Sequence, residues 1–464
     1  MSCILTKWPL YIILLLLVSC GSDDNNYTAY FSGQVKNARQ PYLLFSRDNK
    51  VVDTIKLDKE NHFSVKFDSL TPGMYSFKLE PDYQYIYFDK NDSLSVYIDA
   101  NDFDKSIVFG GRGDRKNNFM MELFAMHEVS KENSYDIFSE SPDKYTHFID
   151  STYALREKFY KKSKEDIQWS EGFDFYAQYR LNLNYYAYKE YYAYVHARRT
   201  ATDVRQDIPK DFFSYRKKID FNNSKLAGFS PFVRYGMALT NNLAYYKTFS
   251  KDAEFKENTL QYSINKLNIA DSVFKNPKIK NQILTSIAFA YLLQDQNVVN
   301  NQKFLQRYSQ LSTEKGPDNE IEKMQKSIKE LSAGNKLPAI GLTNLNNKPF
   351  NIRQEIAQKT VVFFWTGCAR INLQRVYDKI TELKAKYKDI DFIGVNVDND
   401  TEWRKDLQVY NLKGVQQLRA TNFEELRQKW VLTKINRTIV LNADGTIKNA
   451  FTNLLDDDFV KELK

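Results

Sequence analysis

Histidine, glycine, proline and cysteine are all scarce in this chain of 464 residues, which contains four, 16, 11 and three of them. The histidines are scattered without the ligand spacing of a zinc site, so the sequence predicts no metal ion and no other cofactor. The glycine cluster Gly110-Gly111-Arg112-Gly113 lacks the lysine and the spacing of a phosphate-binding loop. No Gly-x-Ser-x-Gly elbow and no assignable acid–base pair of carboxylates is present, which leaves no recognisable hydrolytic site.

A strong charge of one sign is also missing. The 66 lysines and arginines are interspersed with 58 acidic residues, and the net charge is +8. No basic block could follow a phosphate backbone, which argues against nucleic acid as a partner. Hydrophobic residues make up 42% and aromatic residues 15% of the chain, which is enough for packed cores in several domains.

The N-terminus carries the most specific motif in the sequence. Lys7 supplies a positive charge, and 8–18 form an apolar run that is too short to span a bilayer but fits the core of a signal peptide. Leu17-Val18-Ser19-Cys20 then matches a lipobox. The pattern predicts a lipoprotein signal peptide over 1–19 and an acylated Cys20 as the first mature residue. An ordinary secretory signal with an incidental cysteine is the alternative.

Acyl chains such as palmitate on Cys20 would anchor the protein durably to a membrane. The next residue is Gly21, not the aspartate that would signal inner-membrane retention. Residues 20–26 form an acidic tether whose Ser-Asp-Asp run resembles that of surface-directed lipoproteins of the Bacteroidota. The sequence therefore predicts the outer membrane of a diderm envelope, with exposure at the cell surface favoured over a periplasm-facing location.

Residues 27–112 alternate apolar and polar side chains in short runs separated by turn residues. This pattern is typical of an antiparallel sandwich or barrel, and we predict an antiparallel β sandwich. The layout resembles the small β domain that precedes thioredoxin-like domains in many Bacteroidota lipoproteins. The features that carry this resemblance are Phe31, Gly33, Val52-Asp53-Thr54, Phe63, Pro72-Gly73, Phe109-Gly110-Gly111 and Asn117.

Residues 113–335 have few glycines and prolines, and apolar residues recur at spacings of three and four, so the region is predicted to be helical. A dense tyrosine cluster lies within it. Its members at Tyr185, Tyr188, Tyr191 and Tyr192 are a candidate binding surface for a glycan, a small ligand or a protein, because amphipathic rings are favoured at binding surfaces. The alternative is packing of helix against helix with wet hydroxyl groups.

Residues 336–464 show a strand, a helix, a second strand, further helices and a terminal hairpin, which is the order of a thioredoxin core. The region resembles the TlpA/ResA-like branch of the thioredoxin superfamily. The matching segments are 361–365, Val395-Asn396-Val397-Asp398 with Glu402-Trp403, and 441–447.

The resemblance breaks at the catalytic positions. Redox-active members carry Trp-Cys-x-x-Cys with the first cysteine at a helix N-terminus, whereas here Trp365 is followed by Thr366-Gly367-Cys368-Ala369-Arg370-Ile371-Asn372. With a one-residue deletion, Cys368 takes the attacking position and Ile371 replaces the resolving cysteine. Without a gap, alanine and asparagine replace both cysteines. Asn436 stands where the family places its cis-proline.

Three functions remain open on the sequence alone. The leading hypothesis is a non-enzymatic lipoprotein that binds a protein partner in an outer-membrane complex, because its one recognisable catalytic domain lacks the dithiol. The second is thiol–disulfide exchange by Cys368 as a monothiol, with Arg370 nearby. The third is glycan or small-ligand binding by the tyrosine-rich helices.

Overall fold

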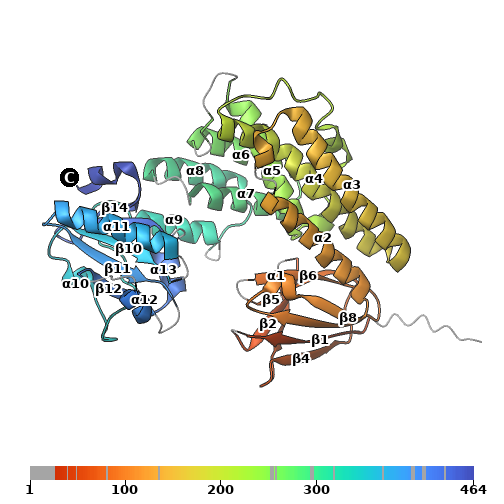
Figure 1. The fold of residues 1–464 in the computed structure, drawn as a ribbon, viewed down its shortest axis with the longest axis horizontal. Helices are drawn as coiled ribbons and strands as arrows, with labels where there is room; N and C mark the ends of the chain where they lie inside the picture. The colour runs from red at the N-terminus through yellow and green to blue at the C-terminus, as the bar shows by residue number, and fades with distance from the viewer. Residues whose placement is uncertain are drawn as a thin grey trace, which may run out of the picture. The chain divides into compact units, whose positions relative to one another are not determined.

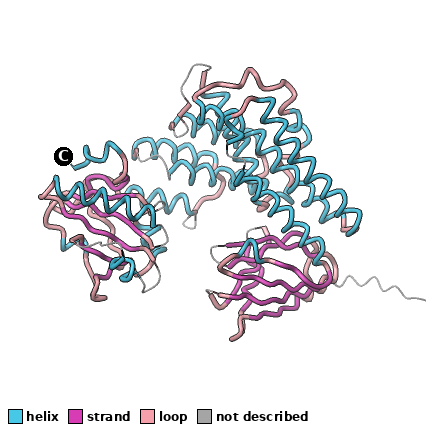
Figure 2. Tube along the Cα trace, in the orientation of Figure 1, coloured by secondary structure: helices cyan, strands magenta, loops and turns pink. Residues whose placement is uncertain are grey.

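The computed structural model describes residues 27–463 except 39, 49, 80–81, 134–135, 251–254, 257–258, 293–296, 317–318, 368–369, 399–402, 410–413 and 433–434. The predicted order of a β-rich region, a helical region and an α/β region is confirmed (Figure 1). Among the described residues, the strands lie in the first and last of these regions (Figure 2). The signal peptide, Cys20 and the acidic tether lie outside the described residues. No described helix is both long and apolar enough to cross a membrane.

The chain forms two compact units. The first contains the described residues up to Ala125 together with Lys161–Ala177, and the second contains Met126–Tyr160 and the chain from Gln178 onward. Three long helices, α2 (Asp114–Asn133), α3 (Pro142–Ile167) and α4 (Glu171–Thr200), each contribute residues to both units.

The described part of the β-rich region forms two four-stranded sheets, in the orders β4-β1-β7-β8 and β3-β2-β5-β6. All pairs are antiparallel except β1 with β7, which is parallel. Aromatic rings pack between the sheets and form part of the core. The ring centroid of Phe31 lies 5.8 Å from that of Phe45 and 5.8 Å from that of Phe77. The strands are β1 (Ala29–Lys36), β2 (Tyr42–Arg47), β3 (Lys50–Lys56), β4 (His62–Phe67), β5 (Gly73–Leu79), β6 (Asp82–Phe88), β7 (Ser93–Asp99) and β8 (Val108–Arg112), with a short helix α1 (Phe103–Ser106) before β8.

Two adjacent asparagines of α2 cover one edge of each sheet. The Asn117 amide accepts from the backbone N–H of Tyr87 at 2.7 Å and donates to its carbonyl at 3.0 Å. Asn118 makes the same pair of bonds with Phe109, at 2.9 and 2.8 Å. Since Tyr87 lies in edge strand β6 and Phe109 in edge strand β8, each amide replaces a missing neighbouring strand.

Gly111 lies near the end of β8, where the chain turns into α2 and only glycine fits. Gly111 has φ +93°, and a Cβ there would lie 2.2 Å from the carbonyl oxygen of Ser93, so no other residue fits without rearrangement. The glycine allows β8 to pair closely with β7 before the chain turns into α2.

We expect Asn117→Ala to lower the free energy of unfolding by about 2–4 kcal/mol, because the N–H and the carbonyl of Tyr87 would both lose their partner in a buried place. Asn117 is 2% exposed. Urea denaturation would measure the change. Ser64→Ala, on the exposed side of β4, is the control and should stay within about 0.5 kcal/mol of the wild type. A loss below about 1 kcal/mol in Asn117→Ala would show that the amide is not needed at this edge.

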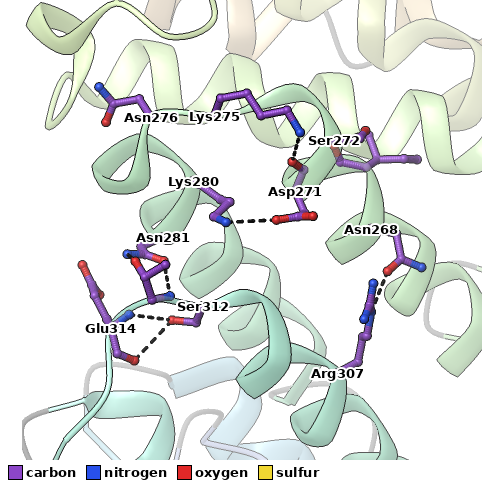
Figure 3. Close-up of polar contacts among 12 residues, drawn as sticks. Asn268, Asp271, Ser272, Lys275, Asn276, Lys280, Asn281, Arg307, Ser312 and Glu314 are labelled. Atoms are coloured by element: carbon purple, nitrogen blue, oxygen red, sulfur yellow. Dashed lines mark hydrogen bonds and ion pairs between the residues drawn. The ribbon is translucent and has the colours of Figure 1, made fainter.

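Helices α5 to α9 follow α4 in the helical region, and neighbouring helices pack against one another. The Asn276-Pro277 pair starts α7 as its sequence indicates, since the Asn276 side chain accepts from the N–H groups of Lys278 and Ile279 at 3.0 and 3.4 Å. Figure 3 shows polar contacts that join neighbouring helices, including Lys280 to Asp271 at 3.0 Å and Arg307 to Asn268 at 2.7 Å. The helices are α5 (Ser230–Thr248), α6 (Leu260–Val273), α7 (Pro277–Leu292), α8 (Val298–Leu311) and α9 (Glu320–Glu330).

Among the described residues of the α/β region, six strands form one sheet in the order β14-β13-β10-β11-β12-β9. Strands β10, β11 and β12 are parallel, and the other pairs are antiparallel. Helix α11 packs on one face of β10, and Trp430 packs against Phe364 on the other. The elements are β9 (Leu342–Asn344), α10 (Ile352–Glu355), β10 (Thr360–Trp365), α11 (Arg370–Lys386), β11 (Asp391–Asn396), α12 (Trp403–Val409), β12 (Gln416–Ala420), α13 (Phe423–Lys429), β13 (Arg437–Leu441) and β14 (Ile447–Asn453).

Candidate functional site

The candidate site lies where the parallel strands end, which is the edge at which α/β sheets bind ligands. Strand β10 ends at Trp365, and α11 begins at Arg370. Cys368 falls between them and lies outside the described residues. Arg370 and Ile371 are described only as the first backbone positions of α11, so Ile371 belongs to the first turn of that helix.

Asp398 organises the loop that leaves β10. Its carboxylate accepts hydrogen bonds from the Thr366 hydroxyl, from the N–H of Gly367 at 2.9 Å and from the Asn396 amide at 2.8 Å. Its backbone carbonyl accepts from Arg419 at 3.2 Å. One residue therefore ties together the ends of β10, β11 and β12. The sequence showed Asp398 as part of a family motif, but not this positioning role.

Trp365, the last residue of β10, is buried and hydrogen-bonded to a residue of β12. Its side chain is 1% exposed, and its indole N–H donates to the Gln417 amide at 3.0 Å. Gln417 in turn donates to the hydroxyl of Tyr377, whose pKa is raised by burial. Gln417 and Tyr377 come from β12 and α11, and neither contact could be recognised from the sequence.

Asn436 lies directly before β13, the strand that pairs with β10. The register places Thr438 opposite Phe363, so the residues before Thr438 run toward the end of β10. The carbonyl of Asn436 accepts from the Thr438 hydroxyl at 3.5 Å. That Asn436 replaces the family's cis-proline stays a prediction.

Arg437, next to Asn436, is a buried cation that was not recognised as a site residue from the sequence. It is 6% exposed, donates to the carbonyl of Ala450 at 2.8 Å and to that of Val431, and lies over the ring of Phe451 at 4.3 Å. Burial lowers the pKa of Arg437 to about 9. Val431 closely follows the end of α13, so the guanidinium holds the chain before β13 against that helix terminus. The available signal in the sequence was an arginine at the start of a strand that ends in three aliphatic residues.

Residues 358–447 match a family model described as thioredoxin-like. The C-terminal domain is thioredoxin-like. No protein of curated function matches the chain.

Solved structures similar to this chain include two from Bacteroides. One is the thioredoxin domain of a thiol-disulfide oxidoreductase from Bacteroides vulgatus, at 19% identity and a TM-score of 0.24, over 28% of this chain and 95% of that one. The other is a thiol:disulfide interchange protein from a Bacteroides species, at 20% identity and a TM-score of 0.23, over 26% and 81% of the two chains.

Two carboxylates lie close to the peptide that leads into Cys368 in the thioredoxin-like domain. One is Asp398, which bonds to Gly367. The other is Asp406 of α12, whose Oδ2 would lie 2.2 Å from a Cβ placed on Gly367. Negative charge near a thiol in general disfavours the thiolate and opposes the effect of a helix N-terminus. The position of the Cys368 thiol relative to these carboxylates lies outside the described residues.

The predicted tyrosine cluster of α4 makes ring contacts and hydrogen bonds with neighbouring residues. Tyr192 is fully buried, stacks on Tyr145 with centroids 4.1 Å apart and donates to the carbonyl of Glu140 at 2.7 Å. Tyr185 packs against Tyr153 at 4.4 Å and donates to Asp150 at 2.5 Å. The other two predicted members, Tyr188 and Tyr191, are partly buried and pack against Phe138 and Tyr194. Tyr145 and Tyr153 lie in α3, so two of the four tyrosines pack between helices.

A buried ion pair lies among these tyrosine rings. Glu190 is fully buried, and its carboxylate accepts from Arg216 at 2.8 and 2.5 Å, from Tyr215 at 2.5 Å and from Asn242 at 2.7 Å. Tyr186 stacks on Tyr215 with centroids 4.1 Å apart. Among the described residues, no three histidine, cysteine or acidic side chains are grouped as metal ligands.

Proposed function

We propose that this protein is a lipid-anchored outer-membrane lipoprotein whose thioredoxin-like domain binds a partner in an envelope complex and does not catalyse disulfide exchange. The observation that carries the proposal is the number of cysteines. The sequence has cysteines only at positions 3, 20 and 368, so the domain has a single thiol. A single thiol can form a mixed disulfide but has no neighbouring thiol with which to resolve it.

The described part of the site supports this proposal. The loop before Cys368 is fixed by Asp398 through the Thr366 hydroxyl and the Gly367 N–H. By the resemblance drawn from the sequence, Asn436 stands where the family has a proline that shapes the substrate groove. An ordered loop and a changed groove are consistent with a domain that serves as a binding surface.

A native pull-down after gentle extraction tests the proposal. A tight partner at fixed stoichiometry supports it, and a monomer without any partner counts against it. Multiple-turnover disulfide reduction by the purified chain, with an electron donor but no added thiol partner, would overturn it. Surface exposure is tested separately by protease treatment of intact cells, which should cleave the chain if it faces outward.

Exchange by Cys368 as a monothiol, with Arg370 nearby, is the second candidate. Measurement of the thiol pKa and trapping of mixed disulfides would decide between the two, with Cys368→Ser as the control. A pKa near the unperturbed value of about 8.5 and no trapped species would exclude this candidate. The third candidate, ligand binding by the tyrosines of α4, gains no support from the rings described above.

Replacing Cys20 with serine tests the anchor. We expect Cys20→Ser to lose incorporation of labelled palmitate and to move from the membrane fraction to the soluble fraction, because acylation supplies the membrane affinity. Detergent phase partitioning of cell extracts measures the shift. Cys3→Ser is the matched control and should leave the distribution unchanged, since residue 3 lies in the predicted signal peptide. Membrane retention of Cys20→Ser would refute lipid anchoring at this residue.

A further inference from the structure

The outer face of the sheet β4-β1-β7-β8 presents two exposed tyrosine rings. Along β1, Phe31 and Val35 point into the sandwich, and the residues that alternate with them point outward. Tyr30 of β1 is 45% exposed, and Tyr97 of β7 is 41% exposed. In contrast to the rings of α4, these two are available to a ligand.

The strand register arranges this face in rows that cross all four strands. The three rows are Lys66–Tyr30–Ser93–Arg112, Ser64–Ser32–Ser95–Gly110 and His62–Gln34–Tyr97–Val108. The outer rows each contain one of the tyrosines. The middle row has no side chain larger than serine.

The spacing of the rows sets the spacing of the rings. The rows of Tyr30 and Tyr97 are four residues apart along the strands, which corresponds to about 13 Å. Between them, the serine hydroxyls of the middle row can both donate and accept hydrogen bonds. The face therefore offers two aromatic rings on either side of a strip of small hydroxyl groups.

Charges on this face are largely neutralised from within the chain. Lys66 pairs with Asp68 at 2.7 Å, and Lys36 pairs with Asp99 at 3.5 Å. His62 lies 3.8 Å from the carboxylates of Asp58 and Glu60. Arg112, in the row of Tyr30, adds an exposed positive charge, and the carboxylates beside His62 are negative. The face therefore mixes both signs and has no strong field with which to attract a polyanion. Electrostatic complementarity therefore favours an uncharged ligand.

The composition also disfavours a protein interface as the occupant. Protein interfaces depend on a few anchors in desolvated, closely packed pockets, whereas the centre of this face consists of fully or partly exposed serines. A neutral sugar chain fits both features, since its hydroxyl groups match the serines and its C–H faces pack on aromatic rings. We propose that the outer face of the sheet β4-β1-β7-β8 binds a neutral polysaccharide through Tyr30 and Tyr97. This binding is independent of the function proposed for the thioredoxin-like domain.

Native affinity electrophoresis of the purified full chain tests this site. The gels contain a soluble neutral polysaccharide (dextran, laminarin, mannan or xylan), and a gel with alginate serves as the acidic comparison. We expect at least one neutral polymer to retard the wild type, and Tyr30→Ala and Tyr97→Ala each to weaken the binding about tenfold. Tyr83→Ala on β6, where the ring is 44% exposed, is the matched control and should bind as the wild type does.

A second variant tests the middle row without removing a ring. Ser95→Glu places a charge among the hydroxyl groups and should abolish retardation in the neutral gels, while circular dichroism shows an unchanged fold. Three outcomes would each overturn the proposal: no retardation by any neutral polymer, retardation by alginate alone, or equal binding by the wild type and the Tyr30→Ala and Tyr97→Ala variants.

Discussion

Ile371→Cys is expected to give this protein repeated turnover in disulfide reduction. The change places a second thiol three residues after Cys368, which restores the Cys-x-x-Cys spacing of a redox dithiol. Residue 371 lies in the first turn of α11, as a resolving cysteine requires. The new thiol can attack a mixed disulfide formed at Cys368 and release the product. Insulin reduction at limiting dithiothreitol measures the gain, from no detectable turnover in the wild type to repeated turnover in the variant.

Matched variants separate the dithiol from other effects of the substitution. Ile371→Ser changes the same side chain without adding sulfur and should remain inactive. Cys368→Ser in the Ile371→Cys background should abolish the gained activity. If carboxylates hold Cys368 as a thiol, adding Asp406→Asn should raise the rate of the variant further, because less negative charge lies near the thiolate. Equal turnover by the wild type and by Ile371→Cys would contradict the view that the missing sulfur limits this domain.

Local patterns were sufficient for much of the fold. Alternation of apolar and polar residues located the strands of the sandwich, and Asn276-Pro277 marked the start of α7 because caps depend on neighbouring residues. The apolar strands β10, β11 and β13 were also evident. Strand β12 was missed because its sequence, Gln416 to Ala420, is short and mostly polar.

Buried polar side chains could not be predicted from the sequence in the same way. Arg437 is stabilised by carbonyl groups of Val431 and Ala450, which are brought to it by the tertiary fold. Asn117 was recognised as part of a resemblance, but its pairing with Tyr87 depends on how α2 meets the sheet. The contacts of Tyr185 and Tyr192 in α4 could not be predicted either, because their partners come from another helix that no local pattern specifies.

Glu190→Gln is expected to lower the free energy of unfolding by about 3–5 kcal/mol, because breaking a buried ion pair leaves the other charge uncompensated. The carboxylate is fully buried, and the Arg216 side chain that it binds is only 25% exposed. The amide can accept only part of the four hydrogen bonds that the carboxylate receives. Thermal and urea denaturation, followed by the helical circular dichroism signal, would measure the loss.

An exposed pair in the same protein provides the comparison. Glu424 and Arg427 are linked at 2.7 Å, but their side chains are 53% and 42% exposed, so Glu424→Gln should cost about 0–1 kcal/mol. The double variant Glu190→Leu with Arg216→Leu should be more stable than either single variant, because no unpaired charge remains. If Glu190→Gln and Glu424→Gln cost the same, the buried network would not be what holds α4 to the segment around Arg216.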